Sequence, residues 1–286
     1  MMTRDQLDFA IDFLTKVLRA LVVIVALVIA ITPFLYLLIN SLKLPLEFLT
    51  VPPTIIPSQI TWEHYQKIFE SGSETPRNLK NSLMITGATT LLSVSIGSLA
   101  AYSLSRLQLP YGIIPAIAFA FLVVRFYPKI ATTLPYYILM RRFGLLDTQL
   151  AIVIAHTSIL LPFVVWIMIG FFQELPKELE QSAMLDGCNA WQRFSKIVLP
   201  ITIPGIVTSA ILTAIGSWNE FLIASSLAVT DAKTLPIAVS GFVTDKGILW
   251  GPMSAMSTII VMPIVIFALF AQRYLVRGLT LGAVKE

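Results

Sequence analysis

"EQSAMLDGCNAWQRFSKIVLP", residues Glu180 to Pro200, is a charged stretch that joins two long apolar parts of the chain. The uncharged interval Thr148 to Gln173 precedes it, and a second uncharged interval, Ile197 to Asn219, begins within it. Each interval is long enough to cross a hydrocarbon core of ~30 Å as a helix, which takes about 20 residues. The position of the charged stretch therefore predicts a connection between two membrane spans.

The composition of the whole chain agrees with this interpretation. Hydrophobic residues make up 56% of the 286 positions, charged residues only 13%, and the mean hydropathy is +0.82. These values lie outside the range of an ordinary soluble domain. Four further uncharged intervals of similar length occur, namely Ala20 to Leu42, Asn81 to Ser105, Leu107 to Val124 and Gly247 to Gln272.

We therefore predict an all-α membrane protein with six transmembrane helices in a single domain, residues 1–286. The predicted spans are approximately 17–41, 81–106, 112–130, 148–173, 202–226 and 251–275. The third span is expected to begin near Ile113, because Pro110 and Gly112 precede it. The segment Ala131 to Met140 is apolar but too short to cross, and its Pro135 and aromatic residues favour a helix at the membrane interface.

Side chains that commonly carry catalysis or bind metals are sparse. Cys188 is the single cysteine, which excludes an internal disulfide and a cysteine-based metal cluster. His64 and His156 stand apart from carboxylates at ligand spacing, so we interpret both as structural. The sequence shows no nucleophile elbow and no phosphate-binding glycine loop. It predicts neither an enzyme nor a metal site.

The connection at residues 174–200 has the local signals of two short helices joined at a glycine. Pro176 suits the first turn of a helix, and Gly187 stands where a left-handed C-terminal cap is expected. Asn189 followed by Gln192 has the spacing of a capping box, which would start the second helix.

The second helix would carry Trp191, Phe194 and Val198 on one face, with Pro200 near its end. A DNA-reading helix-turn-helix is one alternative, but the flanking spans and mixed charges argue against nucleic-acid binding. A solvated loop would explain the charges without explaining the apolar face. A docking surface explains both.

The same stretch resembles the cytoplasmic coupling motif of permease subunits in binding-protein-dependent ABC importers. The family pattern is E-A-A, then D-G, then an I-x-L-P ending. It falls here on Gln181, Ser182 and Ala183, on Asp186 and Gly187, and on Ile197, Leu199 and Pro200. Gln181 stands where Glu is usual, although Glu180 precedes it, and Ser182 replaces Ala.

Other segments are similar to the sugar-importing branch of that family, especially the maltose and trehalose type. They are "NLKNSL" (Asn78 to Leu83), "SWNEF" (Ser217 to Phe221), "KTLP" (Lys233 to Pro236) and "RGLTLGAVKE" (Arg277 to Glu286). The resemblance thus extends over nearly the whole chain.

The resemblance implies a sugar-importing permease that pairs with a second, related permease and two ATPase subunits. An extracytoplasmic sugar-binding protein would deliver the substrate. The chain itself would bind no cofactor, while ATP and Mg would bind to the ATPase partners. The implied coupling residues are Glu180, Gln181, Ser182, Ala183, Asp186, Gly187, Trp191, Phe194, Leu199 and Pro200.

The resemblance also decides the orientation, which charge does not. Ten Lys and Arg residues fall on each side of the six predicted spans, so the positive-inside rule gives no answer. The family motif faces the ATPase, which places residues 174–200 and both termini in the cytoplasm. The expected location is the cytoplasmic (inner) membrane, surrounded by lipid.

Polar residues at membrane depth are candidates for the translocation pathway, because a charge in lipid is costly and normally faces protein or water. Trp218, Asn219 and Glu220 would lie in the fifth span, and Arg125 near the end of the third. An ion pair or a subunit contact is the alternative role for these residues.

Small residues indicate close helix packing. Ser93, Gly97 and Ala101 recur at four-residue spacing in the second span, and Gly205 and Ser209 repeat the pattern in the fifth.

Two other classes of protein remain open. A secondary transporter or channel subunit would need no ATPase, but paired interrupted helices in symmetry-related halves are not evident. A structural membrane subunit would explain the spans without explaining the coupling motif.

Overall fold

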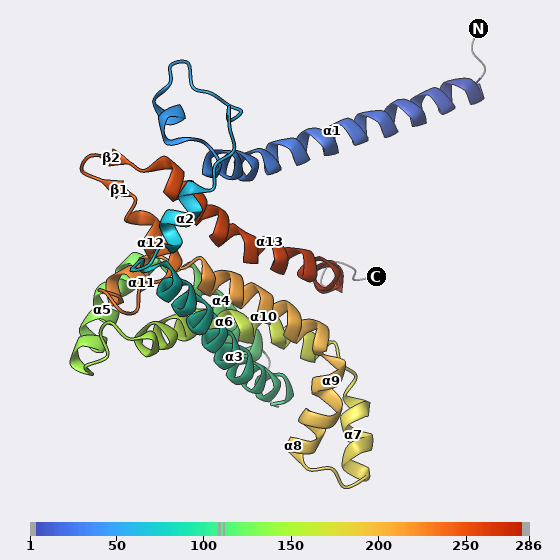
Figure 1. The fold of residues 1–286 in the computed structure, drawn as a ribbon. Coiled ribbons are helices and arrows are strands. Elements are labelled where there is room, and N and C mark those ends of the chain that lie inside the picture. The colour runs from blue at the N-terminus through green and yellow to red at the C-terminus, as the bar shows by residue number, and fades with distance from the viewer. Residues whose placement is uncertain (1–3, 108–109, 111, 282–286) are drawn as a thin grey trace. The chain divides into compact units, whose positions relative to one another are not determined.

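The computed structural model describes residues 4–107, 110 and 112–281, except for the side chains of residues 4–10, 125, 271 and 273–281. The end of the tail motif, residues 282–286, lies outside the described residues. Figure 1 shows that the chain is mostly helical, with one short hairpin. It divides into two compact units, one formed by Met1–Ser71 and Phe242–Val261 and the other by Gly72–Gly241 and Met262–Glu286.

The first unit contains a long helix, a buried lysine and a short hairpin. Lys43 is buried, and its amine donates a hydrogen bond to the Thr54 carbonyl at 2.5 Å. The ring Nε2 of His64 lies 2.8 Å from the Lys43 carbonyl oxygen, which gives this buried histidine a structural contact. The elements are α1 (Arg4–Ser41), η1 (Pro45–Leu49), α2 (Glu63–Phe69), the antiparallel pair β1 (Val243–Thr244) and β2 (Gly247–Ile248), and the first part of α13 (Trp250–Leu281).

The second unit is a bundle in which three helices pack on one another and shorter helices surround them. The three are α3 (Thr75–Arg106), α6 (Gln149–Gln173) and α10 (Ile203–Trp218). α4 (Ile113–Phe126) packs on α6, α11 (Leu222–Leu227) packs on α5 (Lys129–Arg142), and α12 (Leu235–Ser240) packs on α3. One apolar cluster lies around Ile152 and Ile223, and a second lies around Phe172 and Phe194.

Glycines set the spacing of the packed helices, as the four-residue pattern of small residues predicts. Ser93, Gly97 and Ala101 are all buried in α3. A Cβ at Gly97 would lie 2.7 Å from Cγ1 of Val164 in α6, and a Cβ at Gly205 would lie 2.5 Å from the ring of Phe171. The predicted close helix contacts are therefore confirmed.

The helix boundaries agree with four of the predicted spans and differ at two. Within the described residues, four helical segments are long and apolar enough to cross a membrane, and the number rises to six if each of two bent helix pairs forms one span. The four are Ile11–Ser41, Thr75–Arg106, Gln149–Gln173 and Trp250–Phe270. The third predicted helix does begin at Ile113, but α4 has only 14 residues and ends at Phe126, before Pro128.

The fifth predicted span, 202–226, is not one continuous helix. α10 ends at Trp218, and the separate helix α11 begins at Leu222. Toward its N-terminus, α10 follows the segment Ala190–Ile201 after a bend of 78°. Uncharged composition could not reveal either break, because it measures affinity for lipid and not the direction of the backbone.

Candidate functional site

The segment 174–200 folds as a bent helix pair. α7 (Lys177–Leu185) follows Pro176, and Gly187 adopts the predicted left-handed conformation with φ of 81°. The predicted capping box is confirmed, because the Gln192 N–H donates to Asn189 Oδ1 and the Asn189 N–H donates to Gln192 Oε1, each at 2.9 Å. These caps end one helix and start the next within a few residues.

The second arm of the pair is longer than a single regular helix. α8 (Ala190–Arg193) continues through one turn of π-helix, η2 (Phe194–Val198), into α9 (Leu199–Ile201). Phe194 and Val198 are buried in the apolar cluster around Phe172, so this part of the predicted docking face packs within the chain instead. Trp191 is 63% exposed and remains accessible, and its ring lies 5.7 Å from that of Phe194.

The pair has an exposed apolar side. Leu185 is 90% exposed and Met184 is 56% exposed at the end of α7, and Trp191 lies just beyond the bend. The remaining residues implied by the motif differ in their exposure to solvent. Ala183 is buried, Leu199 is partly buried, and Gln181, Ser182, Asp186, Gly187 and Pro200 are exposed.

Glu180 points inward rather than toward solvent. Its residue is 8% exposed, and its carboxylate accepts hydrogen bonds from Arg106 Nε and the Tyr102 hydroxyl of α3, each at 2.5 Å. Arg106 also donates to the carbonyl of Phe172 at 2.9 Å. Sequence reasoning included Glu180 in the motif but gave no indication of its partners.

Glu220 caps the start of α11. Its carboxylate accepts the backbone N–H groups of Ile223 and Ala224, at 3.1 and 3.0 Å. The same oxygen lies 3.3 Å from Nε2 of His156, and Lys129 Nζ lies 3.9 Å from the other oxygen. The contacts of His156 agree with the structural role that the sequence predicts, although sequence spacing does not indicate Glu220 as its neighbour. The imidazole joins α6 to this cap, and its Nδ1 lies 2.9 Å from the Ser217 hydroxyl.

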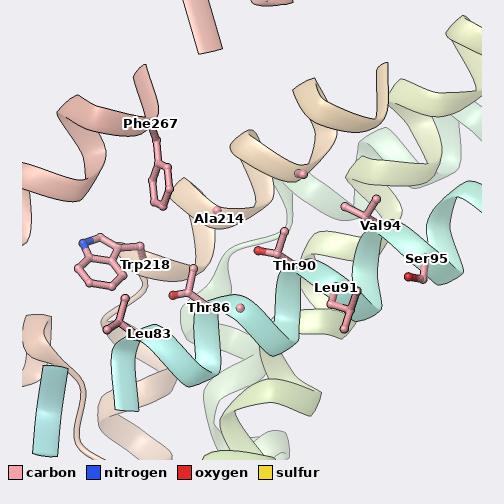
Figure 2. Close-up of a pocket in the computed structure, with 11 residues that line it drawn as sticks. Leu83, Thr86, Thr90, Leu91, Val94, Ser95, Ala214, Trp218 and Phe267 are labelled. Carbon is pink, nitrogen blue, oxygen red and sulfur yellow. The ribbon is translucent and has the colours of Figure 1, made fainter. Parts of the chain in front are cut away.

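The predicted pathway residues are placed differently from one another. Trp218 is buried and lines an apolar groove of about 480 Å³ between α3 and α10, which Phe267 also lines (Figure 2). Asn219 is exposed, and its side-chain amide donates to the Ile215 carbonyl. Arg125 belongs to α4, but its side chain is outside the described part of the structure.

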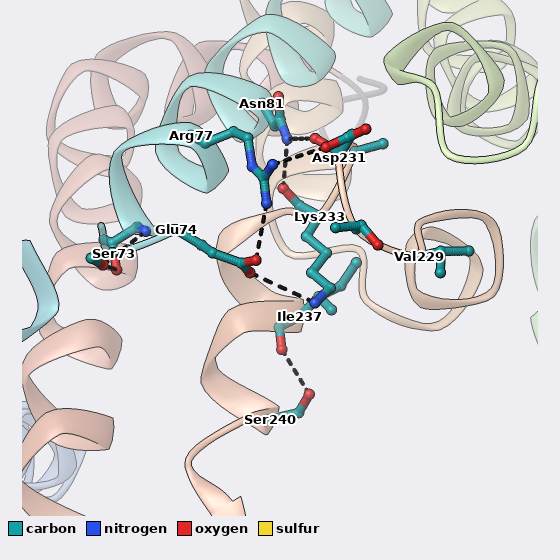
Figure 3. A network of polar contacts seen from close by, with 12 residues as sticks. Ser73, Glu74, Arg77, Asn81, Val229, Asp231, Lys233, Ile237 and Ser240 are labelled. Atoms are coloured by element: carbon teal, nitrogen blue, oxygen red, sulfur yellow. Dashed lines mark hydrogen bonds and ion pairs between the residues drawn. The ribbon is translucent and has the colours of Figure 1, made fainter. Parts of the chain in front are cut away.

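A polar network joins the N-terminal part of α3 to the segment 229–235 (Figure 3). The Asn81 amide donates to the carbonyls of Asp231 and Lys233 at 2.7 and 2.9 Å. Arg77 pairs with Asp231 at 2.9 Å, and the Ser82 hydroxyl accepts the Leu235 N–H at 2.9 Å. Two motifs whose bonded residues are 152 and 153 positions apart in the chain, "NLKNSL" and "KTLP", are thus joined by hydrogen bonds.

Asp147 anchors the same segment from the other side. It has a positive φ of 58°, and its carboxylate accepts the backbone N–H groups of residues 229–232 at 2.9 to 3.1 Å. Burial alone would raise the pKa of this carboxyl group, but the hydrogen bonds from the four N–H groups outweigh it and hold the pKa below its ordinary value.

Among the described residues, no group of three His, Cys, Asp or Glu side chains is placed to hold a metal ion. The polar clusters instead join helices or cap helix ends.

Comparison with known proteins identifies the family. The model for the "Binding-protein-dependent transport system inner membrane component" matches residues 94–281. The chain belongs to this family. It is therefore a permease component of an ABC transporter, a non-catalytic subunit of the inner membrane.

Individual members of the family cover most of the chain. The trehalose transport system permease protein SugB of Mycobacterium tuberculosis is 37% identical over 81% of this chain and 84% of its own length. The trehalose/maltose transport system permease protein MalG of Thermococcus litoralis is 32% identical over 96% of this chain and 98% of its own length.

The fold of this permease is also found in a solved transporter. A chain of a bacterial ABC transporter involved in the import of the acidic polysaccharide alginate superposes with a TM-score of 0.77. The match covers 96% of this chain and 99% of that one, at 19% identity. The likeness shows a common fold.

Proposed function

We propose that this permease is the transmembrane subunit of an ATP-driven importer of disaccharides or short oligosaccharides. It would form the translocation pathway with a second, related permease. It would couple to two ATPase subunits through the bent helix pair, and an extracytoplasmic binding protein would supply the sugar. The names of SugB and MalG mention trehalose transport and trehalose/maltose transport, and they support this class of substrate.

The observation that carries the proposal is the exposed apolar side of the bent helix pair. Leu185, Met184 and Trp191 expose large apolar side chains beside a glycine bend. Exposed apolar surface rimmed by polar residues is typical of a protein interface. Gln181 and Asp186, both exposed, supply the polar rim.

The orientation follows from this assignment. If the bent helix pair docks on an ATPase, residues 174–200 and both termini lie on the cytoplasmic side. Six crossings would then require α4 with α5 to form one crossing, and α10, which follows the bent segment, to form another. Accessibility of single cysteines to an impermeant maleimide in right-side-out vesicles tests this placement.

Purification of the permease with its native partners tests the function. We expect an ATPase and a second permease to co-purify, and reconstituted vesicles to take up radiolabelled trehalose or maltose only with ATP and the binding protein. Uptake driven by an ion gradient without ATP would instead identify a secondary transporter.

A pair of variants tests the docking surface directly. Leu185→Glu places a charge on the exposed apolar side and should reduce the co-purified ATPase at least tenfold. Leu49→Glu is the matched control, because Leu49 is 79% exposed but lies in η1, far along the chain from the bent helix pair. Equal loss of ATPase in both variants would argue against docking at α7.

A further inference from the structure

The bent helix pair is connected to two helices of the bundle by the chain itself, and to a third only by side chains. α7 follows α6 after three residues, and the second arm leads through α9 into α10. α3 has no such connection to the pair. Its polar contact is made by Arg106 and Tyr102, which together use both carboxylate oxygens of Glu180.

This joint is built to resist separation. The side chains of Arg106 and Glu180 are only 17% and 10% exposed, so pulling them apart would leave a charge without its partner in a largely dry site. The Tyr102 ring lies 5.8 Å from that of Phe172 and 5.0 Å from that of Phe194. The ends of α3 and α6 are thereby fixed to both arms of the pair.

The opposite part of α3 holds a different segment. There Asn81 and Ser82 bind the backbone of segment 229–235 through three hydrogen bonds. From Asn81 to Arg106, α3 runs as one helix, a distance of about 38 Å at 1.5 Å per residue. Over its length α3 packs on both α6 and α10.

We propose that Glu180 is a positioning residue for coupling, and that its pair with Arg106 makes α3 the rod that transmits movement of α7 to segment 229–235. The inference rests on the proposed function, because a docked ATPase supplies the movement. It adds a route that does not follow the chain from α7 into α6 or α10.

The test uses the complete complex of both permeases, the ATPases and the binding protein, reconstituted in vesicles. Glu180→Ala removes the joint. Glu180→Gln keeps an oxygen that accepts from Arg106, and Tyr102→Phe removes one donor but keeps the ring packing. The matched control is Glu178→Ala, since Glu178 is exposed on the same helix.

Three readouts separate positioning from docking and folding. The first is the amount of ATPase that co-purifies, and the second is the sugar transported per ATP hydrolysed. The third is the nucleotide-dependent signal of a spin label attached at Thr230→Cys, a position that is exposed. Cys188→Ser is introduced as well, so that the label attaches at residue 230 alone.

We expect the amount of ATPase that co-purifies with Glu180→Ala to stay within twofold of the parent. The variant should transport at least tenfold less sugar per ATP hydrolysed, and the spin label at residue 230 should no longer respond to nucleotide. Glu180→Gln should recover most of the coupling, and Glu178→Ala should behave as the parent. If Glu180→Ala does not fold, so that it pairs with neither the second permease nor the ATPases, Tyr102→Phe decides, with an expected two- to fivefold loss of coupling.

Coupling within twofold of the parent in Glu180→Ala, together with an unchanged label response, would overturn the inference. Loss of ATPase binding in a Glu180→Ala variant that still folds and pairs with the second permease would also overturn it, because Glu180 would then belong to the docking surface. Uptake by a parent complex without any ATPase would overturn the proposed function itself.

Discussion

Replacing Gly97 with alanine should destabilise the permease, although alanine is the better helix former. In an exposed helix the exchange stabilises by about 0.5–1 kcal/mol. Here the new Cβ would lie 2.7 Å from Cγ1 and 3.0 Å from Cβ of Val164. Val164 is fully buried and β-branched, so its χ1 is restricted, and its Cβ cannot move without α6. Overpacking of this kind costs about 1–3 kcal/mol, which leaves a net loss of about 1 kcal/mol.

Gly87 provides the matched control in the same helix. A Cβ at Gly87 would meet nothing within 4 Å, so Gly87→Ala should stabilise by about 0.5–1 kcal/mol. Thermal unfolding in detergent measures both, with shifts of about 2–4 °C per kcal/mol for a chain of this size.

A double variant tests the assigned cause. Adding Val164→Ala to Gly97→Ala removes the methyl groups that clash, so the two changes should be non-additive by about 1 kcal/mol or more. A rise in melting temperature for Gly97→Ala equal to that of Gly87→Ala would refute the close approach of α3 and α6.

Four further predictions follow from the polar and bent parts of the structure. Gly187→Val should cost about 1–2 kcal/mol at its positive φ and lower ATPase co-purification, whereas Gly187→Asn should be tolerated better. The pKa of Asp147 is lowered in the folded state, so the stability that its carboxylate contributes is complete above the unfolded pKa of about 4. This stability is lost as the pH falls through the folded pKa. The melting temperature of Asp147→Asn should therefore lack this part of the fall with acid that the parent shows. Glu220→Ala should reduce sugar uptake more than assembly with the second permease, and normal uptake would leave Glu220 a purely structural cap. Gln181→Glu should be tolerated in uptake assays, whereas Gln181→Lys removes an acceptor and should be damaging.

The caps of the bent helix pair could be predicted from sequence because their interactions are local. The left-handed Gly187 and the capping box of Asn189 and Gln192 each depend on residues within four positions of one another. The small-residue pattern around Gly97 was equally readable, since helical spacing alone puts Ser93 and Ala101 on the same face.

Long-range partners could not be predicted, because no spacing rule connects them. Arg106 and Glu180 are 74 residues apart, and Asn81 binds a segment more than 150 residues away. His156 looked isolated because its carboxylate, Glu220, lies more than 60 residues along the chain, in the break between α10 and α11. The break after Trp218 was hidden for a related reason, since Glu220 acts there as a cap and not as a charge inside a continuous span.

The register of α7 bears on the departure of this chain from the family pattern. Glu180 precedes Gln181, and at first sight it could replace the glutamate that is usual one position later. Consecutive residues of an α-helix point about 100° apart, so the two side chains need not reach the same surface. Glu180 is committed to Arg106 and Tyr102, whereas Gln181 is exposed. The polar group offered to a docking partner at this point is therefore an uncharged amide. A partner that binds it by hydrogen bonding would keep its affinity in high salt better than one that relies on an ion pair, because salt screens charges and leaves a neutral hydrogen bond largely unaffected.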